Sequence, residues 1–282
     1  GGHYYGGSST FKYLGDVWAV DVDTMMWHNP TCAGGGPSPR YGHTATVIGY
    51  KLYVFGGRGP KGVLYNDMWC LDVETWTWDR MSSTTAPPLG RFGHSSLLVG
   101  TKIVYFGGWD GSKPFNDLWV YDTEAFCWIK PKVAGPKPTA RYGHVSALSR
   151  DGRIIIFGGA AVDDKGRPSY LSDVKQLDTE TMVWRRCRVT GDHPAARANM
   201  SGCDVANTLT FYGGWSGVKK SIVPDSAIVR SGDRPSSSDP RGTTNPHLFM
   251  LDLAAMEWTQ PKCAGTQPSK RYGHSVTPVG SK

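Results

Sequence analysis

The sequence has no apolar run long enough to form a helix that crosses a membrane. It also has no tract of Lys and Arg of the kind that marks nucleic-acid binding, although its formal net charge is +7. The basic residues are scattered along the chain, so the charge favours acidic partners only weakly. We therefore expect neither a membrane nor a nucleic acid as partner.

Cysteine is present without the spacing that binds zinc. None of the six cysteines belongs to a C-x-x-C pair, and structural zinc sites usually contain such pairs. Cys32 and Cys263 each follow a tryptophan by five residues, which indicates spacing inherited with a repeat and not a designed disulfide bridge. Free, buried thiols are typical of a reducing compartment, so we predict a cytoplasmic protein.

Catalytic signatures are also missing. The sequence has no G-x-S-x-G element and no glycine-rich loop that precedes a helix. Four histidines have no carboxylate at the i,i+4 spacing of a helical metal site: His3, His28, His193 and His247. A metal site assembled by the fold from distant ligands would leave no such trace. We expect no catalytic residues, no metal and no cofactor.

Turn residues and aromatic residues are abundant. The 282 residues include 36 Gly and 19 Pro, and 12% are aromatic, which favours one large all-β domain of many short strands. The stretch from Arg91 to Trp128 shows the pattern, since it reads RFGH, SSLLVG, KIVYFGG, a polar turn, NDLWVYD and a closing FCW. Short apolar runs that alternate with turn residues are typical of strands.

Three signals recur along the chain at a nearly constant interval. The first is R-[YF]-G-H, with copies that begin at Arg40, Arg91, Arg141 and Arg271 and a worn copy at Arg197. The second is a double glycine after an apolar run, at Gly56-Gly57, Gly107-Gly108, Gly158-Gly159 and Gly213-Gly214. The third is an Asp followed six residues later by a Trp, as in Asp21 and Trp27, Asp72 and Trp78, Asp122 and Trp128, Asp178 and Trp184, and Asp252 and Trp258.

A period near fifty residues with a double glycine resembles the kelch repeat. The WD repeat is the rival, but its period is shorter and it has no paired glycine. The resemblance implies a kelch-type β-propeller in which each copy is a four-stranded antiparallel blade. The glycines would let the chain turn after a strand, and plates such as Trp78 and Trp128 would fill the space between adjacent sheets.

The resemblance covers one domain, residues 1–282, in copies at about 1–39, 40–90, 91–140, 141–196 and 197–270 with a partial copy at 271–282. In the first copy either Gly1-Gly2 or Gly6-Gly7 fits the double glycine. RYGHSVTPVGSK at the other end is predicted to supply an opening strand. The half-copies either close a ring of five blades or belong to a six- or seven-bladed propeller of which this chain is a part, and we favour the second. An insertion at about 218–246, rich in Ser, Pro and Gly, is predicted to be a mobile loop.

The resemblance also implies a binding face. In kelch propellers the loop before the first strand and the loop after the double glycine meet on one face, where known adaptor members bind acidic peptides through arginines. The matching positions predict partner-binding residues at Arg40, Arg58, Arg91, Trp109, Arg141, Arg197, Trp215 and Arg271, with Ala160 at the same position as Trp109 and with His3 if Gly1-Gly2 is the true pair. The alternative for a repeated Arg is a structural pair with a neighbouring carboxylate or backbone group. The repeated His is expected to anchor a turn.

We therefore predict a protein–protein interaction module, a scaffold or adaptor that binds an acidic protein segment. The residues do not separate a ubiquitin-ligase adaptor from a cytoskeletal or ciliary scaffold or a trafficking effector, and they leave the oligomeric state open. The alternative is a propeller enzyme, of the oxidase or epimerase type, that acts on a sugar or small metabolite. A deep channel lined by carboxylates and His would favour the enzyme.

Overall fold

The computed structural model describes residues 1–5, 11–163, 166–217, 242–244 and 247–279 as strands joined by turns and loops, with one short 3-10 turn at Pro60–Gly62. The all-β prediction is confirmed. The chain divides into two compact units, which we describe separately. Unit 1 comprises residues 1–105, 110–112 and 119–129, and unit 2 comprises residues 106–109, 113–118 and 130–282.

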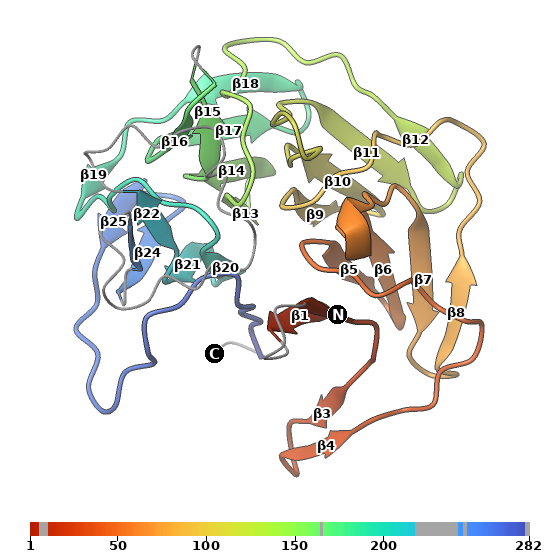
Figure 1. The fold of residues 1–282 in the computed structure, drawn as a ribbon. Coiled ribbons are helices and arrows are strands. Elements are labelled where there is room, and N and C mark those ends of the chain that lie inside the picture. Colours follow the sequence, from red (N-terminus) through yellow and green to blue (C-terminus); the bar gives the residue numbers. More distant parts are fainter. Residues whose placement is uncertain (6–10, 164–165, 218–241, 245–246, 280–282) are drawn as a thin grey trace. The chain divides into compact units, whose positions relative to one another are not determined.

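Unit 1 holds two four-stranded sheets built on the same plan. Blade 1 consists of β5 (Thr44–Ile48), β6 (Lys51–Phe55), β7 (Met68–Asp72) and β8 (Thr77–Arg80). Blade 2 consists of β9 (Ser95–Val99), β10 (Lys102–Phe106), β11 (Leu118–Asp122) and β12 (Cys127–Ile129), with Phe106 and Leu118 assigned to unit 2. In each sheet the strands are hydrogen-bonded in sequence order, and β5 contacts β9 (Figure 1).

Two hairpins complete unit 1. The first pairs β1 (Gly2–Tyr5) with β2 (Phe11–Leu14), and the second pairs β3 (Ala19–Asp21) with β4 (Met26–His28). Trp27 lies on the second hairpin and is 66% exposed. It differs from the other tryptophans of the Asp-to-Trp signal because no four-stranded sheet forms around this hairpin in the described part of the chain.

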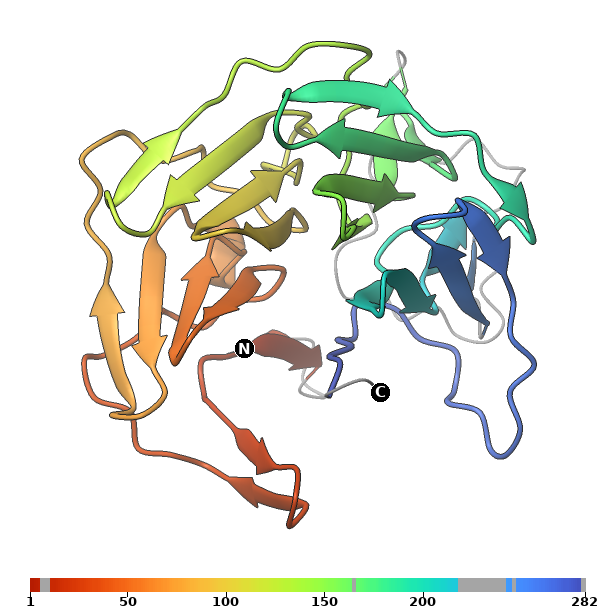
Figure 2. The same ribbon diagram turned by 180° about the vertical axis from the view of Figure 1, so that it is seen from behind.

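Unit 2 repeats the plan with additions. Blade 3 consists of β13 (Val145–Leu148), β14 (Arg153–Phe157), β17 (Val174–Asp178) and β18 (Val183–Arg186). Blade 4 consists of β20 (Ser201–Val205), β21 (Thr208–Tyr212), β24 (Leu248–Asp252) and β25 (Glu257–Thr259), with β19 (Thr190–Gly191) parallel to β25. Small hairpins follow the double glycines, namely β15 (Ala160–Val162) with β16 (Pro168–Tyr170) and β22 (Trp215–Gly217) with β23 (Gly242–Thr244). The green strands of blade 3 lie beside the teal and blue strands of blade 4 in both views (Figure 1, Figure 2).

An aromatic wedge joins each sheet to the next within a unit. The Phe that ends the second strand packs on the Trp of the following repeat, at ring distances of 4.7 Å for Phe55 and Trp128 and 4.8 Å for Phe157 and Trp258. The tryptophans that end the Asp-to-Trp signal in the four sheets, Trp78, Trp128, Trp184 and Trp258, are 1–7% exposed. A sheet whose face carries such a ring cannot bury it alone, so the blades must pack face to face.

The fixed gap of six residues between Asp and Trp is explained by the turn that joins the third and fourth strands. Oδ1 of Asp72 accepts hydrogen bonds from the backbone N–H groups of Glu74 and Thr75, and Asp178 and Asp252 do the same in their repeats. Trp76 then adopts φ 54°, which reverses the chain. Any insertion between the Asp and the Trp would break this Asx turn.

The backbone hydrogen bonds also show which glycine pair belongs to the first copy. The backbone N–H of Gly2 donates to Arg40 O at 2.8 Å, as Gly57 N–H does to Arg91 O and Gly159 N–H to Arg197 O. Gly1 and Gly2 therefore form the double glycine, and His3 occupies the position of Arg58. The alternative pair at Gly6 and Gly7 lies outside the described residues.

Two expectations about the second half of the chain have different outcomes. The predicted opening strand after Arg271 is wrong for the described residues, because residues 271–279 are assigned no strand. A strand needs a hydrogen-bonding neighbour, and no described strand pairs with this segment. The insertion predicted at about 218–246 lies almost entirely outside the described residues, so its mobility stays a prediction.

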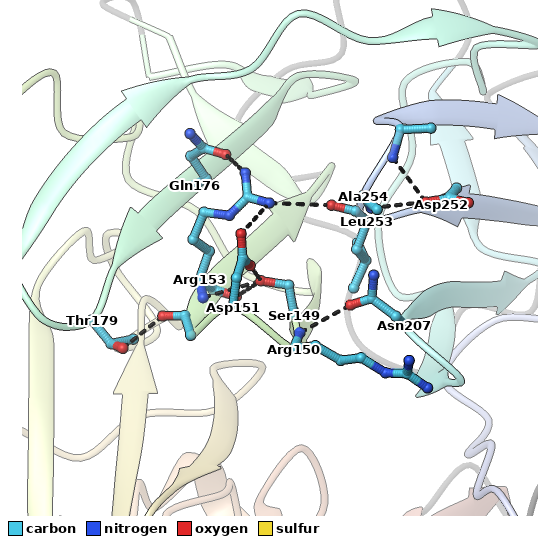
Figure 3. A network of polar contacts seen from close by, with 12 residues as sticks. Ser149, Arg150, Asp151, Arg153, Gln176, Thr179, Asn207, Asp252, Leu253 and Ala254 are labelled. Atoms are coloured by element: carbon cyan, nitrogen blue, oxygen red, sulfur yellow. Dashed lines mark hydrogen bonds and ion pairs between the residues drawn. The ribbon is translucent and has the colours of Figure 1, made fainter.

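The blades of unit 2 are also joined through a polar network at the turns between their strands (Figure 3). The Arg153 guanidinium pairs with Asp151 at 2.7 Å and donates to Gln176 Oε1 and to the backbone carbonyl of Leu253 in blade 4. The backbone N–H of Arg150 donates to Asn207 Oδ1 at 2.9 Å. These contacts couple the turns of blade 3 to those of blade 4.

A feature that sequence inspection missed is the cover over the outer edge of each sheet. The linker that follows the last strand of one repeat runs parallel to the last strand of the next, as Ala134 does beside Val183. Gly135, at φ 79°, then lies directly against the Trp184 carbonyl oxygen, and Gly34 and Gly191 do so at Trp78 and Trp258. In blade 2 the hydroxyl of Thr85 takes this place and donates to the Trp128 carbonyl oxygen at 2.8 Å. The linker thereby protects an exposed strand edge.

We predict that Gly135→Ala lowers the free energy of unfolding by about 3 kcal/mol, because a Cβ would collide with the Trp184 backbone at a left-handed φ. Gly265→Ala is the matched control, since Gly265 has φ 81° but no atom within 4 Å of a built Cβ. It should cost only the backbone strain, about 1 kcal/mol. Chemical denaturation of both variants measures the difference, and equal losses would contradict the role of this contact.

Candidate binding face

The repeated arginine of R-[YF]-G-H lies in the interior and is held by two kinds of acceptor. Arg40 Nη1 donates to Gly56 O at 2.9 Å, and its two Nη atoms contact the Asp67 carboxylate at 2.6 and 3.0 Å. Arg141 makes the same set with Gly158 O and Asp173, at 2.8 and 3.0 Å to the carboxylate. A bidentate pair of this kind fixes the start of the third strand against the end of the second.

Four of the five repeated arginines are 0–2% exposed, namely Arg40, Arg91, Arg141 and Arg197, whereas Arg271 is exposed. Arg40 and Arg141 thus pair with a carboxylate and a backbone carbonyl, which is the structural role that the sequence left open as the alternative to partner binding. A guanidinium that is buried and paired inside the protein is not available to a partner without loss of the pair. Arg40, Arg91 and Arg141 are therefore not proposed as partner-binding residues, whereas Arg197, which is equally buried, forms no ion pair with a described carboxylate.

The repeated histidine is also a structural residue. A Cβ on the first glycine of the double glycine would approach both the carbonyl oxygen of the next repeated Arg and the histidine Cε1, at 2.7 Å from Arg91 O and 2.9 Å from His94 for Gly56, so only glycine fits there. His94 Nε2 contacts Thr44 Oγ1 of the preceding repeat at 2.9 Å. Burial lowers the pKa of His144 to about 3 and that of His43 to about 4, so both imidazoles are neutral in the folded chain.

We predict that the chain loses stability as the pH falls below the unfolded-state histidine pKa of 6.5. Below pH 6.5 the unfolded chain binds a proton at His144 that the folded chain does not bind. The contribution of His144 to the free energy of unfolding is therefore complete above pH 6.5 and is lost as the pH falls toward 3. At pH 5 the loss from His144 alone is about 2 kcal/mol. His144→Gln should flatten the dependence of unfolding free energy on pH between 7 and 5, whereas His28→Gln, at an exposed position, should leave the slope unchanged.

The residues after the double glycines lie at a different level, beside the aromatic residues of R-[YF]-G-H. We call these two sets together the loop face, and we describe it separately for each unit. In unit 1 the His3 ring lies 4.3 Å from the Tyr41 ring, and the Arg58 guanidinium lies 5.7 Å from the centre of the Phe92 ring. Arg58 is partly exposed, and it forms no ion pair with a described carboxylate. It is therefore a charged group that the repeat itself does not neutralise.

In unit 2 two aromatic pairs lie on the loop face. Trp109 packs on Tyr142 at 5.0 Å and Trp215 on Tyr272 at 5.9 Å, and both tryptophans are 9% exposed. These two tryptophans are therefore too buried to offer their ring faces directly to a partner. Their faces support the tyrosines, which remain partly exposed.

Ala160 and Ala198, in two successive repeats, occupy positions at which the other copies carry larger side chains. Tyr170 on β16 pairs with Ala160 in the hairpin register, and burial raises its pKa to about 12, which the Trp215 indole partly offsets. It therefore supplies the aromatic ring that the repeat positions lack. Sequence reasoning missed Tyr170, and it also passed over Tyr41 and Phe92, although the [YF] of the motif was a signal for the latter pair.

The described residues also bear on metal binding, on membrane insertion and on the state of the cysteines. No group of three or more His, Cys, Asp and Glu side chains in the described ranges is placed to hold a metal ion. Within the same ranges no helix has the length and apolar character to span a membrane. All six cysteines are free thiols, but the predicted burial holds only for Cys70, since Cys263 is exposed and the other four are partly buried. The cytoplasmic location stays a prediction.

Four-stranded antiparallel sheets, each opened by a buried Arg and turned by a double glycine, define a β-propeller blade protein. Residues 1–214 match the family model described as the KLHDC2/KLHL20/DRC7 Kelch-repeats domain, so the chain belongs to the kelch-repeat family. The resemblance to the kelch repeat and the all-β propeller fold predicted from the sequence are confirmed. Membership of this family supports a role in binding other proteins.

Similar curated proteins include longer chains of several kinds. Acyl-CoA-binding domain-containing protein 4 of Arabidopsis thaliana is 28% identical over 281 residues, which cover 94% of this chain and 38% of that protein. Kelch domain-containing protein 3 of Homo sapiens is 29% identical over 71% of this chain and 54% of that protein. Host cell factor of Drosophila melanogaster is 27% identical over 95% of this chain and 14% of that protein. The chain therefore spans about half or less of these relatives.

We predict that Asp173→Asn lowers the free energy of unfolding by about 3 kcal/mol, because it leaves the buried Arg141 without its counter-charge. The matched control is Asp163→Asn, which removes a more exposed pair with Arg167 and should cost less than about 1 kcal/mol. Thermal or chemical unfolding measures both. A loss for Asp173→Asn as small as that of the control would contradict the structural role of the repeated arginine.

Proposed function

We propose that this chain is a protein-interaction module that binds an acidic protein segment on the loop face, with Arg58 as the principal charged contact. The supporting observation is the state of Arg58: a guanidinium that is partly exposed, lies over Phe92 and pairs with no described carboxylate. Arginine in this setting suits a carboxylate or phosphate of a partner, because its planar fork can donate two hydrogen bonds.

The surroundings of Arg58 favour the same ligand. In unit 1, residues 1–5, 11–14 and 56–66 contain Lys12, Arg58 and Lys61 and no Asp or Glu, whereas the loop at 110–112 contributes Asp110. Tyr41 pairs with Arg58 in an isolated β-bridge, and its ring packs beside that of Tyr13 with the two centroids 5.9 Å apart. Aromatic residues and Arg are the residue types that dominate binding energy at protein interfaces.

We propose different contributions for Arg271, Trp109 and Trp215, which the sequence predicted as direct partner contacts. Arg271 is exposed and can contribute charge in unit 2. Trp109 and Trp215 act through the partly exposed rings of Tyr142 and Tyr272, which they support. The enzyme alternative has no observation in its favour among the described residues, where no metal cluster occurs. The absence of enzymatic activity stays a prediction.

We predict that peptides selected by the chain from a random displayed library are enriched in Asp and Glu, and that Arg58→Ala weakens their binding at least about tenfold. Lys61→Ala is the control, because Lys61 is exposed in the same loop. Fluorescence polarisation at two salt concentrations measures the affinities, and binding should weaken at higher salt. Selection of uncharged sequences, or equal affinity of wild type and Arg58→Ala, would count against the proposal.

A further inference from the structure

Comparison of the repeats with one another identifies a buried arginine that has lost its partner. Arg40 and Arg141 each contact a carboxylate that immediately precedes the third strand, at Asp67 before β7 and Asp173 before β17. In blade 4 the third strand is β24, and the residue before it is His247. The register is the same in the three blades, since Phe55, Phe157 and Tyr212 pair with the first residue of the third strand. His247 therefore replaces the aspartate.

Arg197 retains the rest of the arrangement. Its Nε donates to Ala195 O at 2.9 Å and its Nη1 to Gly213 O at 3.3 Å, which are the counterparts of the backbone contacts of Arg40 and Arg141. The two contacts to a carboxylate are absent, and no carboxylate of the described residues forms an ion pair with it. Arg197 is nevertheless 1% exposed. Blade 4 thus keeps the cradle for a guanidinium–carboxylate pair and lacks the carboxylate.

The second donor to that carboxylate has disappeared as well. Two residues after the aspartate, Trp69 donates to Asp67 Oδ2 at 2.8 Å and Lys175 contacts Asp173 Oδ2 at 3.1 Å. The equivalent residue in blade 4 is Phe249, whose ring centre lies 5.0 Å from the Arg197 guanidinium. A ring face offsets only part of the cost of burying a positive charge. Burial lowers the pKa of Arg197 to about 10, so the group is still charged at neutral pH.

We propose that Arg197 binds an anionic group, a carboxylate or a phosphate, in the place that the aspartate takes in the other blades and where blade 4 has His247. His247 is exposed, so the place that the aspartate takes in the other blades, which no described carboxylate fills in blade 4, lies next to a surface residue of unit 2. The arginine can donate to the anion from Nη2 and Nη1, as Arg40 and Arg141 do to their aspartates. The group can come from a free anion or from an acidic side chain of a partner. This site is separate from Arg58 and does not depend on the function proposed above.

The experiment compares the wild-type chain with His247→Asp, which restores the aspartate of the other repeats. Unfolding midpoints are measured at pH 7 in inorganic phosphate and in chloride at equal ionic strength. We expect phosphate to raise the wild-type midpoint by about 3 °C in a saturable manner. His247→Asp should raise the midpoint in chloride and abolish the phosphate effect. His247→Asn, which supplies no carboxylate, should keep the phosphate effect.

A transfer variant and a peptide arm complete the test. Asp67→His recreates the blade 4 arrangement at Arg40 and should add a second phosphate-dependent rise. A Glu-rich ten-residue peptide with blocked ends, acting at concentrations far below those of phosphate and only without the His247→Asp change, would identify a protein segment as the source. Protection by phosphate alone would identify a free anion. No phosphate or peptide effect on the wild type, or equal effects on wild type and His247→Asp, would overturn the proposal.

Discussion

The contact on which each repeat depends is the buried arginine that joins the end of the second strand to the start of the third. Arg40 binds the carbonyl of Gly56 and the carboxylate of Asp67, so one side chain closes a loop of variable length between two strands. The backbone carbonyl of the same kind of arginine accepts a hydrogen bond from the double glycine of the preceding repeat, as Arg91 O does from Gly57. One residue thus fixes both its own sheet and its attachment to the neighbour.

This arrangement separates the scaffold from the part of the loop face that can vary. Since the arginine holds the strand ends, the residues after the double glycine can differ without loss of the fold, and they are His3, Arg58, Trp109, Ala160 and Trp215. Hairpins of different length are accommodated there too, as β15–β16 and β22–β23 show. Loops carried on a rigid sheet are where binding residues usually occur. In unit 2 the hairpin residue Tyr170 even supplies a ring that Ala160 and Ala198 lack.

The repeats are also internal controls for one another. Blade 4 has Asn199 where the other copies have the glycine of R-[YF]-G-H, and Asn199 adopts φ 55° as that glycine does. The change is tolerated because Asn accepts the left-handed region better than most residues. The exchange of Asp for His247 has no comparable compensation in the described residues, since the charge of Arg197 remains. A substitution that removes the partner of a buried charge, as at His247, is therefore a stronger indication of a binding function than one that only has to fit the backbone conformation, as at Asn199.

The sequence by itself determined the repeat, the strand character of its segments and the burial of Trp78, Trp128, Trp184 and Trp258, because these follow from local alternation and a fixed period. Only the tertiary structure decided the roles of the arginines. Arg40 and Asp67 are 27 residues apart, and no local pattern shows that their side chains meet in the interior while Arg58 pairs with no described carboxylate. The choice of Gly1-Gly2 over Gly6-Gly7 and the seat of Gly135 against Trp184 were likewise decided by contacts between distant segments. Such contacts depend on which strands become neighbours, and the sequence of one strand does not specify that.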